Sequence, residues 1–492
     1  MGLAEKILFF ILFILCAFII ITLIRAIFYT PKKRDIPKFS KEKVDAKKAA
    51  EHLSGAIRIP TVSYPEWENV DWSQFERFHK YLEETYPLIH KTLSKEVISK
   101  ASLLYRWKGK NPSLEPIALL SHQDVVPVAP GTEKDWEHPA FGGENDGEFI
   151  WGRGALDMKN HLICVMEAVE TLIDEGFEPE RDVYLCFGHD EEVVASEHSG
   201  AKSIMDTLKS RGIRLDSVLD EGGAILPVNI KGIINKNLAG IGIAEKGYAD
   251  FEISISSKGG HSSQPPKHTA LGQLADVIKD LENHQFKSKL LPFLSQLFAN
   301  IGRNASYPAR IIACNIWLLK PVIKAVMKRL PPAACMIRTT TAVTMSQGSP
   351  AANVLPQIAA VTVNFRQMPG TTTADIERHI KKVVRNKNIN IKVLKSKEAS
   401  KFSPTDSRAF KIIEELCMAD NADNIVAPYL VMGGTDACFY EPICDNIYRF
   451  SPFHVNTSLL LCTHATNEKV PVSTLGQGVS FFKSYVRNLS QS

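Results

Sequence analysis

The amino-acid sequence predicts an α/β domain with a mainly parallel sheet, an α+β domain inserted into it, and a transmembrane helix at the N-terminus. Three observations support this fold class: an apolar run near the N-terminus, short apolar runs that alternate with helical patterns, and a different order of elements in the middle of the chain. We divide the chain into residues 7–29 (transmembrane anchor or signal sequence), 30–44 (linker), 45–246 and 403–492 (the two parts of the α/β domain) and 247–402 (the inserted domain).

The N-terminal apolar run covers residues 7–24, and Arg25 and residues 32–34 place positive charge behind it. A helix of this length rises about 27 Å, which is enough to cross a hydrocarbon core of roughly 30 Å. The run is long for a cleaved signal peptide and no small-x-small site follows it, so we favour an anchor and keep a signal sequence as the alternative. The flanking charge favours a cytosolic body, but long domains can translocate regardless. We expect a single-pass protein with a luminal or extracellular body, secreted if the segment is cleaved.

The charge and the cysteines limit the possible partners. The 492-residue chain is 45% hydrophobic and 23% charged, and its net charge of +4 resides in residues 1–34. The remaining residues are balanced, which argues against a nucleic-acid partner. The nine cysteines form no CxxC pair and no regular framework, and we expect most of them to be small buried side chains.

The α/β domain is predicted from alternating buried strands and helices. Short apolar runs at residues 117–120, 183–187 and 217–219 are typical of strands covered on both faces. Between the first two runs, residues 159–175 have apolar side chains at helical spacing, and Gly176 is placed to end that helix.

The inserted domain is predicted from a β-α-β-β-α-β order of elements, the split βαβ pattern. These elements fall at residues 251–256, 269–282, 339–344, 360–365, 373–384 and 389–394. A long apolar stretch at about 285–338 separates the first helix from the next strand. It is either a core element, or an apolar wall for an acyl chain, or a surface that rests on a membrane.

Acidic and histidine side chains follow each predicted strand of the α/β domain, at the edge where an open sheet binds ligands. They occur in the segments SHQD (121–124), GRGALDMK (152–159), GHDEE (188–192) and LDEGG (219–223). Carboxylates that converge there would repel one another unless a cation neutralised them. Mixed histidine and carboxylate ligands suit Zn²⁺ or another divalent transition metal, so the pattern predicts a two-metal hydrolase.

Seven motifs occur in the order SHQDVVPV, GRGALDMK, GHDEE, LDEGG, GGHSSQPP, NFRQMPG and GGTDA. With them the chain, over residues 45–490, resembles the dizinc metallohydrolases that include aminoacylase-1, carboxypeptidase S and the secreted N-fatty-acyl-amino acid synthase/hydrolases. The resemblance implies a zinc-peptidase-like catalytic domain and an inserted lid or dimerisation domain. It also implies two Zn²⁺ per subunit, held by His122, Asp157, Glu192, Asp220 and His464.

The resemblance further implies roles for the remaining site residues. Glu191 would be the general base and Asp124 would orient His122, while Glu221 stays open as an alternative ligand to Asp220. The substrate-binding residues would be His261, which meets the oxyanion and often does so across a homodimer, and Asn353 and Arg366, which hold the substrate's carboxylate.

The function that follows is a zinc-dependent amidohydrolase that cleaves, or in reverse forms, the amide bond of N-acyl amino acids, with N-fatty-acyl compounds preferred. A carboxypeptidase acting on short peptides is the alternative within the class, and an inactive membrane-anchored binding protein is the alternative outside it. The chain departs from many relatives at Cys438, where Arg is frequent, and at Val194 and Ala195, where glycines are frequent. These departures bear on substrate choice and leave the metal ligands intact.

Overall fold

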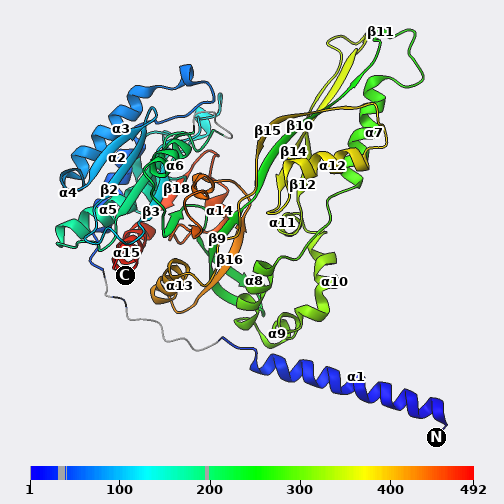
Figure 1. Cartoon of the computed structure of the whole chain (residues 1–492), viewed down its shortest axis with the longest axis horizontal. Helices are drawn as coiled ribbons and strands as arrows, with labels where there is room; N and C mark the ends of the chain where they lie inside the picture. Colours follow the sequence, from blue (N-terminus) through cyan, green and yellow to red (C-terminus); the bar gives the residue numbers. More distant parts are fainter. Residues whose placement is uncertain (1, 32–38, 40–41, 194–198, 492) are drawn as a thin grey trace.

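The computed structural model describes residues 2–31, 39, 42–193 and 199–491 (Figure 1). The predicted linker therefore lies partly outside the described residues, and Val194 and Ala195 lie wholly outside them. The N-terminal helix α1 (Leu3–Phe28) projects away from the body, which it contacts beside α9. Within α1, residues 5–28 are long and apolar enough to cross a membrane.

The central sheet has nine strands in the order β1-β2-β6-β3-β7-β17-β9-β16, with β8 paired to β9. The sheet is mixed, which differs from the mainly parallel prediction: β3 runs parallel to β6 and β7, whereas β1, β2 and β6 pair antiparallel. An apolar run marks a buried strand but carries no information about its direction. The bounds are β1 Ser94–Ile98, β2 Ser102–Trp107, β3 Ile117–His122, β6 Val183–Gly188, β7 Ser217–Asp220, β8 Ile225–Ile230, β9 Ile234–Glu245, β16 Asn424–Val431 and β17 Ile447–Arg449.

Helices cover both faces of this sheet and form two hydrophobic cores. One face carries α5, which starts at the predicted residue, together with α2, α13 and α15, and the other carries α6 and the 3₁₀ helix η3. The bounds are α2 Ala46–Ile57, α3 Trp72–Thr85, α4 Pro87–Thr92, α5 Lys159–Asp174, α6 Gly200–Ser210, α13 Arg408–Asp420, η3 Asp436–Tyr440, α14 Thr457–Leu460 and α15 Val472–Leu489. A small sheet of β4 (Glu144–Asn145), β5 (Phe149–Trp151) and β18 (Lys469–Pro471) completes this part.

An ion-pair network at Glu42 attaches the start of the α/β part to α15. The Glu42 carboxylate lies 3.3 Å from Lys483 Nζ and 3.1 Å from Arg487 Nε, both on α15, and the Lys483 side chain is fully buried. Glu175, at the end of α5, also contacts Lys483 at 2.8 Å. A buried charge is tolerated only when it is paired, so this network fixes Glu42 on α15.

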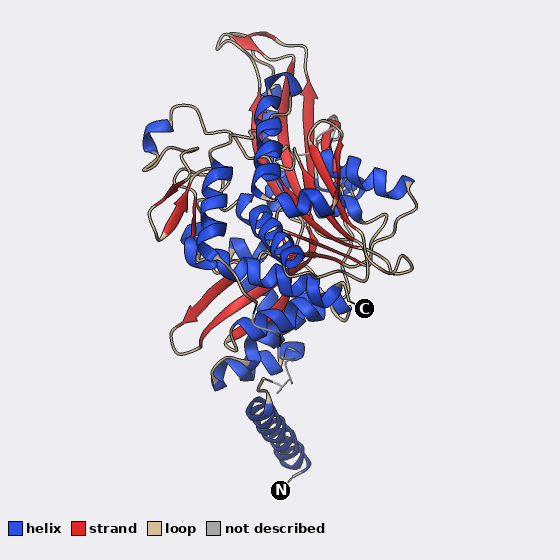
Figure 2. Ribbon diagram, turned by 90° about the vertical axis from the view of Figure 1, so that its left-hand side faces the viewer, coloured by secondary structure: helices blue, strands red, loops and turns tan. Residues whose placement is uncertain are grey.

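The inserted domain contains the predicted order of elements and a four-stranded antiparallel sheet, β12-β14-β10-β15 (Figure 2). Helices α7 and α12 pack on this sheet, and β11 and β13 form a two-stranded antiparallel sheet at the tip that lies farthest from the central sheet (Figure 1). The bounds are β10 Gly247–Ser256, β11 Gly260–His261, α7 Ala270–Asn283, β12 Thr340–Gln347, β13 Val354–Leu355, β14 Ile358–Gln367, α12 Thr373–Val383 and β15 Asn390–Lys397.

The apolar stretch between α7 and β12 forms four further helices. They are α8 (Pro292–Arg303), α9 (Tyr307–Cys314), α10 (Ile316–Met327) and α11 (Pro331–Cys335). Helix α8 packs on β16 of the central sheet, with Phe293 and Leu294 buried, and α9 packs between α8 and α1. This stretch therefore supports the central sheet and the N-terminal helix, in addition to the inserted domain.

Candidate metal centre

Four of the five predicted ligands converge near the ends of β3, β6 and β7: His122, Asp157, Glu192 and His464. The donor atoms of His122, Asp157 and Glu192 lie within 4.8 Å of one another, and those of His122, Glu191 and Glu221 form a second group of the same size. His122 is the last residue of β3 and is 1% exposed, so it joins the two groups from the floor of the site.

Asp157 has the geometry of a bridging carboxylate. Its Oδ1 lies 3.2 Å from His122 Nε2, and its Oδ2 lies 3.0 Å from His464 Nε2. His464 also lies 3.0 Å from Glu192 Oε2. The two oxygens of Asp157 thus face two different histidines, as one carboxylate must in order to serve two metal ions.

The backbone at His464 is unusual. Its φ angle is 62°, in the left-handed region that non-glycine residues seldom adopt. Such conformations are concentrated at functional sites, where the surrounding structure holds them. The turn presents the half-exposed His464 ring to Asp157 and Glu192 from the side opposite His122.

The geometry favours Glu221 over the predicted Asp220 as the ligand after β7. Glu221 Oε1 lies 3.3 Å from His122 Nε2. The Asp220 carboxylate instead accepts hydrogen bonds from the backbone N–H groups of Ala437, at 2.8 Å, and Glu221, at 2.8 Å. Successive side chains of a strand point to opposite sides, so only one of the two neighbours can face the cluster.

Asp124 lies next to His122 and is completely buried. Its Oδ1 is 3.4 Å from His122 Nδ1, and the same ring nitrogen is 3.0 Å from the Asp124 backbone oxygen. The carboxylate also accepts hydrogen bonds from Ser63 Oγ at 2.6 Å and from the backbone N–H groups of Glu191 and Glu192 at 3.2 Å. Asp124 therefore holds both the His122 ring and the turn that carries the two glutamates, which is the position expected of a carboxylate behind a proposed ligand.

The electrostatics of the cluster fit a bound cation. Burial, with Asp157 nearby, raises the pKa of Glu192 to about 7 and the pKa of Glu221 to about 8. Hydrogen bonds to Asp157 and Glu192 raise the pKa of His464 to about 10. A divalent cation would relieve the repulsion among these carboxylates, and imidazole nitrogen with carboxylate oxygen is a donor set that Zn²⁺ accepts.

Glu191 stands next to the ligands and lines the adjoining polar cavity. Burial raises the pKa of the Glu191 carboxyl well above its usual range; His122 opposes this rise, and Glu221 and Glu192 add to it. A carboxylate with a raised pKa can accept a proton at neutral pH, which is what a general base requires.

Glu468 is a site residue to which the sequence analysis gave no role. It is fully buried, and its Oε1 accepts hydrogen bonds from the backbone N–H groups of Leu156, at 2.9 Å, and Asp157, at 3.0 Å. Its Oε2 pairs with Arg153 at 2.5 Å. Glu468 follows His464 by four residues, so one turn supplies a candidate ligand and holds the loop that carries Asp157.

A polar cavity of about 390 Å³ opens on one side of the cluster. Glu191, Glu192 and His464 line it from the catalytic side, and three cations line it from the inserted domain and its junction: Lys246, Arg366 and Lys397. The Arg366 guanidinium lies over the Tyr248 ring, 4.8 Å from its centre. The structure thus places Arg366 beside the cluster and adds two cations that the sequence analysis missed.

Lys397 lies beside Cys438. Its Nζ donates a hydrogen bond to the Thr435 backbone oxygen at 3.2 Å and lies 3.6 Å from Glu245 Oε1. Burial lowers the pKa of Lys397, but Cys438 and Glu245 outweigh this effect and hold its pKa above the usual value. A cation from β15 therefore occupies the region beside Cys438.

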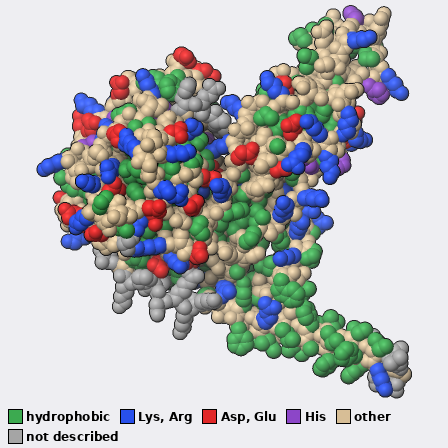
Figure 3. Space-filling view, in the orientation of Figure 1, with side chains coloured by type: hydrophobic (Ala, Val, Ile, Leu, Met, Phe, Trp, Pro, Cys, Tyr) green, Lys and Arg blue, Asp and Glu red, His purple; other side chains and the backbone are tan. Residues whose placement is uncertain are grey.

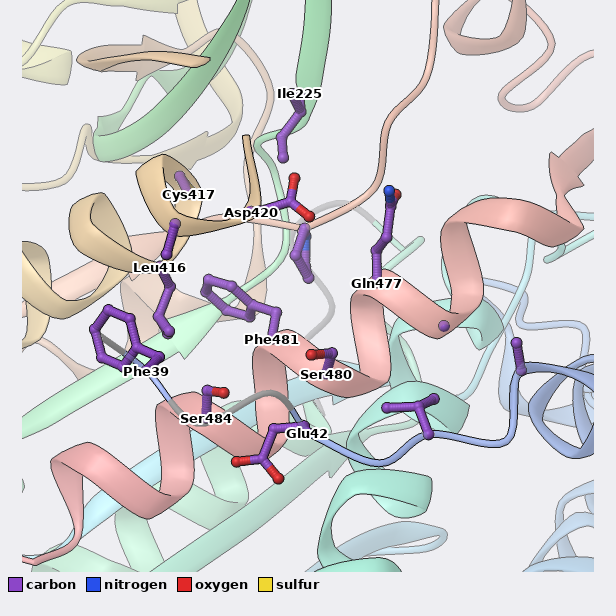
Figure 4. Close-up of a pocket in the computed structure, with 15 residues that line it drawn as sticks. Phe39, Glu42, Ile225, Leu416, Cys417, Asp420, Gln477, Ser480, Phe481 and Ser484 are labelled. Atoms are coloured by element: carbon purple, nitrogen blue, oxygen red, sulfur yellow. The ribbon is translucent and has the colours of Figure 1, made fainter. Parts of the chain in front are cut away.

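An apolar cavity of about 530 Å³ opens on the other side of the cluster. Asp157 and Glu221 line it together with Leu297, Ile301 and Met336 of the helical stretch. A separate cavity of about 510 Å³ lies where Phe39 and Glu42 meet α13 and α15 (Figure 4), and the predicted site residues do not line it.

His261 and Asn353 do not join the cluster within one chain. They lie together at the two-stranded β11–β13 sheet, where Ser262 N donates to the Asn353 backbone oxygen at 3.0 Å. Figures 1 and 2 place this small sheet at the far tip of the inserted domain.

Comparisons with known proteins identify a family and several similar sequences. Residues 118–488 match the profile of Peptidase family M20/M25/M40. The chain is 34% identical over 485 residues to a probable carboxypeptidase S-like 2 of Dictyostelium discoideum, covering 96% of this chain and 92% of that protein. It is 35% identical over 461 residues to the N-fatty-acyl-amino acid synthase/hydrolase PM20D1 of Homo sapiens, covering 92% and 89%. It is 32% identical over 503 residues to carboxypeptidase S of Saccharomyces cerevisiae, covering 90% and 84%.

Solved structures share the fold at low identity. An M20 family metallo-carboxypeptidase from Sulfolobus solfataricus gives a TM-score of 0.63 at 17% identity, covering 89% of this chain and 98% of that one. Human carnosine dipeptidase 1 gives a TM-score of 0.60 at 12% identity, covering 91% and 97%.

Proposed function

Because the chain belongs to Peptidase family M20/M25/M40, and is thus a metallohydrolase of peptides and amides, we propose that it hydrolyses, and in reverse forms, the amide bond of N-acyl amino acids. The observation that carries the proposal is the pair of unlike cavities on the two sides of one cluster. An amide whose acyl side is apolar and whose amine side bears a carboxylate matches this pair, and N-fatty-acyl amino acids have that form.

The cluster would hold two Zn²⁺ ions, with His122, Asp157, Glu192, Glu221 and His464 as ligands. Bound zinc would supply a Lewis acid and make water a nucleophile at neutral pH. Glu191 takes the proton of the attacking water and delivers it to the leaving amine, so the same carboxyl serves as base and then as acid. Asp124 and Glu468 hold His122 and the Asp157 loop in place.

The polar cavity would bind the substrate's carboxylate. Arg366 presents a planar fork that can donate two parallel hydrogen bonds to a carboxylate, and Lys397 adds a point charge from the neighbouring strand. Both cations come from the inserted domain, so this domain would select substrates that have a free carboxylate.

The apolar cavity would bind the acyl chain. Its volume of about 530 Å³ exceeds what an acetyl group needs, and aliphatic side chains from α8 line it. Each buried methylene contributes about 0.8 kcal/mol, so a long acyl chain gains far more from this cavity than a short one.

A carboxypeptidase acting on short peptides is the second candidate, and its support is the similarity to the two carboxypeptidase S proteins. Such an enzyme would use the same Arg366 and Lys397 for the terminal carboxylate, but it would have no use for an apolar cavity of this size. The inactive binding protein is disfavoured, because donor side chains occupy each ligand position of the cluster.

The test is a substrate panel on the purified full-length protein with Glu191→Gln as the inactive control. We expect kcat/KM for N-acyl-phenylalanine to rise with acyl-chain length and to exceed that of dipeptides. If acetyl compounds or dipeptides are cleaved as well as long-chain compounds, the fatty-acyl assignment is wrong.

The N-terminal helix would retain the protein at a membrane, with the body on the luminal or extracellular side. The length and apolar surface of α1 support this proposal. Protease protection of the body in sealed microsomes, together with retention of residues 2–31 in the mature protein, tests topology and cleavage at once.

His261 and Asn353 would serve the cluster of a second copy, through dimerisation of the inserted domain. Their position at the far tip of that domain supports this arrangement. Mixing the variants Glu191→Gln and His261→Ala, each inactive alone, would restore activity, whereas a mixture that stays inactive would contradict it.

A further inference from the structure

The charged side chains of the helical stretch between α7 and β12 are all positive. Residues 285–338 contain nine Lys and Arg side chains and no Asp or Glu, although residues 35–492 as a whole are neutral. Lys320, Lys324 and Lys328 repeat at four-residue spacing along α10 and form one basic stripe. A surface of this kind attracts an anionic partner and repels a second copy of itself.

The same helices expose an apolar stripe. Leu318, Val322 and Val326 follow one another at four-residue spacing on α10, and their exposed fractions are 44%, 59% and 49%. Ile312 on α9 and Trp317 at the start of α10 are also more than half exposed, at 54% and 53%. Figure 3 shows hydrophobic side chains gathered over α1 and the adjoining helices, with basic side chains beside them. The lysines are offset from this apolar stripe by two residues, which places them on the opposite face of α10. An apolar face opposite a lysine-bearing polar face is the pattern of a helix that lies in a membrane interface.

Contacts with α1 set the position of this surface. The Trp317 ring packs edge-on against Phe18 with 6.2 Å between ring centres, and Tyr307 Oη donates to the Leu23 backbone oxygen at 3.1 Å. Phe18 is ten residues before the end of α1 at Phe28, which is about 15 Å along a helix. If α1 crosses a bilayer, the start of α10 therefore lies at the depth of the lipid chains.

The neighbouring side chains suit the boundary between lipid and water. Tyr29 follows α1, and the Arg303 guanidinium of α8 lies over its ring at 4.8 Å. Arg25, near the end of α1, donates to the Cys314 backbone oxygen at 3.2 Å. Tyrosine, tryptophan and arginine are the residues that concentrate at this boundary.

We infer that the exposed face of α9 and α10 docks into the surface of an anionic lipid bilayer, beside α1. The apolar stripe enters the acyl-chain region, and the lysines on the opposite face extend their long side chains to the lipid headgroups. This inference is independent of the proposed reaction, because α9 and α10 contribute no residue to the two cavities beside the cluster.

The test places a tryptophan reporter on the surface of the full-length protein in nanodiscs that contain brominated phosphatidylcholine and phosphatidylserine. Trp317→Phe supplies the baseline, and Val322→Trp or Val326→Trp is added to it. Ile358→Trp in the same background is the matched control, since Ile358 is 61% exposed on β14, away from these helices. We expect brominated lipid to quench the reporters at 322 and 326 at least about twofold more than the reporter at 358.

The charge dependence is tested by leaving out phosphatidylserine and by the triple variant Lys320→Gln, Lys324→Gln, Lys328→Gln. Each change should reduce quenching at Val322→Trp. Equal quenching at 322, 326 and 358 would overturn the docking. So would a signal at 322 that responds to protein concentration and not to brominated lipid, since a second copy would then cover this face.

Discussion

The two cavities beside the cluster differ in chemistry and in origin. The polar cavity places Lys246, Arg366 and Lys397 opposite the acidic residues, and the apolar cavity places aliphatic side chains of α8 beside Asp157 and Glu221. In both cases the catalytic part supplies the reacting groups, and the segment between β9 and α13 supplies most of the cations and much of the apolar wall. Under the proposed function, catalysis and substrate choice rest on different parts of the chain, so they should separate under mutation.

The largest effect is expected from Glu191→Gln, which acts on the part that both cavities share. The amide keeps the size of the side chain but cannot accept the proton, so kcat should fall at least about 10²-fold for every substrate. Zinc content, measured by atomic emission, should stay near that of the wild type. A variant that keeps near-full turnover would refute the role of Glu191 as the base.

Changes at the ligands should behave differently. His122→Ala and His464→Ala should lose both zinc and activity, because each removes a proposed ligand. The adjacent pair supplies a matched comparison: Glu221→Gln should lower zinc content, whereas Asp220→Asn should affect it less. If the order is reversed, Asp220 is the ligand after all.

Arg366→Met should act on the polar cavity alone. A hydrogen bond to a charged group contributes about 1.5–3 kcal/mol, so KM for N-acyl amino acids should rise about 10- to 100-fold. Methyl esters of the same compounds, which lack the carboxylate charge, should be affected little. An equal loss for acids and esters would show that Arg366 supports the fold and not the substrate.

Ile301→Asn should act on the apolar cavity alone, with Ile301→Val as its control. The polar amide would remove the apolar contacts that Ile301 makes with one or two methylenes of a long acyl chain. The preference for long over acetyl chains should therefore fall about tenfold. The measurement is kcat/KM across an acyl-phenylalanine series. An unchanged preference would place the acyl chain elsewhere.

The smallest effect concerns stability, outside both cavities. Burial lowers the pKa of His79 to about 4, and its Nε2 lies 2.9 Å from Gln123 Oε1 and 3.1 Å from the Ala101 oxygen. The unfolded chain binds a proton near pH 6.5 and the folded chain does not, so this contribution is present at pH 7 and is lost as the pH falls toward 4. We expect a loss of about 1–2 kcal/mol between pH 7 and 5. His79→Gln should show a smaller loss in urea unfolding at the two pH values.

Much of the fold followed from local pattern. The runs that became β3, β6 and β7, the helix α5 and the element order of the inserted domain are all visible in hydrophobic spacing. The direction of the strands could not be predicted from this spacing, because a strand buried on both faces has the same pattern in a parallel and an antiparallel pair. The apolar stretch was recognised, but its packing against α1 depends on contacts nearly 300 residues apart.

The candidate site also contains residues that could be predicted from the sequence and residues that could not. The convergence of residues in turns after strands, such as His122 and Glu191, could be predicted because the sheet edge brings them together. Asp220 and Glu221 could not be separated, since their alternation depends on where β7 ends. Lys397 and Glu468 lie in no pattern of their own and become site residues only through the folding of distant segments.

The ion pairs that fix Glu42 to α15 also limit the length of the free connection between α1 and the body. Phe39 already lies against α13 and α15 (Figure 4), and eight peptide units separate it from Pro31, just beyond α1. A fully extended chain of that length reaches about 28 Å at most. If α1 spans a membrane as proposed, a body held this close to the lipid samples a thin layer of solution, in which a substrate dissolved in the bilayer is abundant even when its concentration in bulk water is negligible.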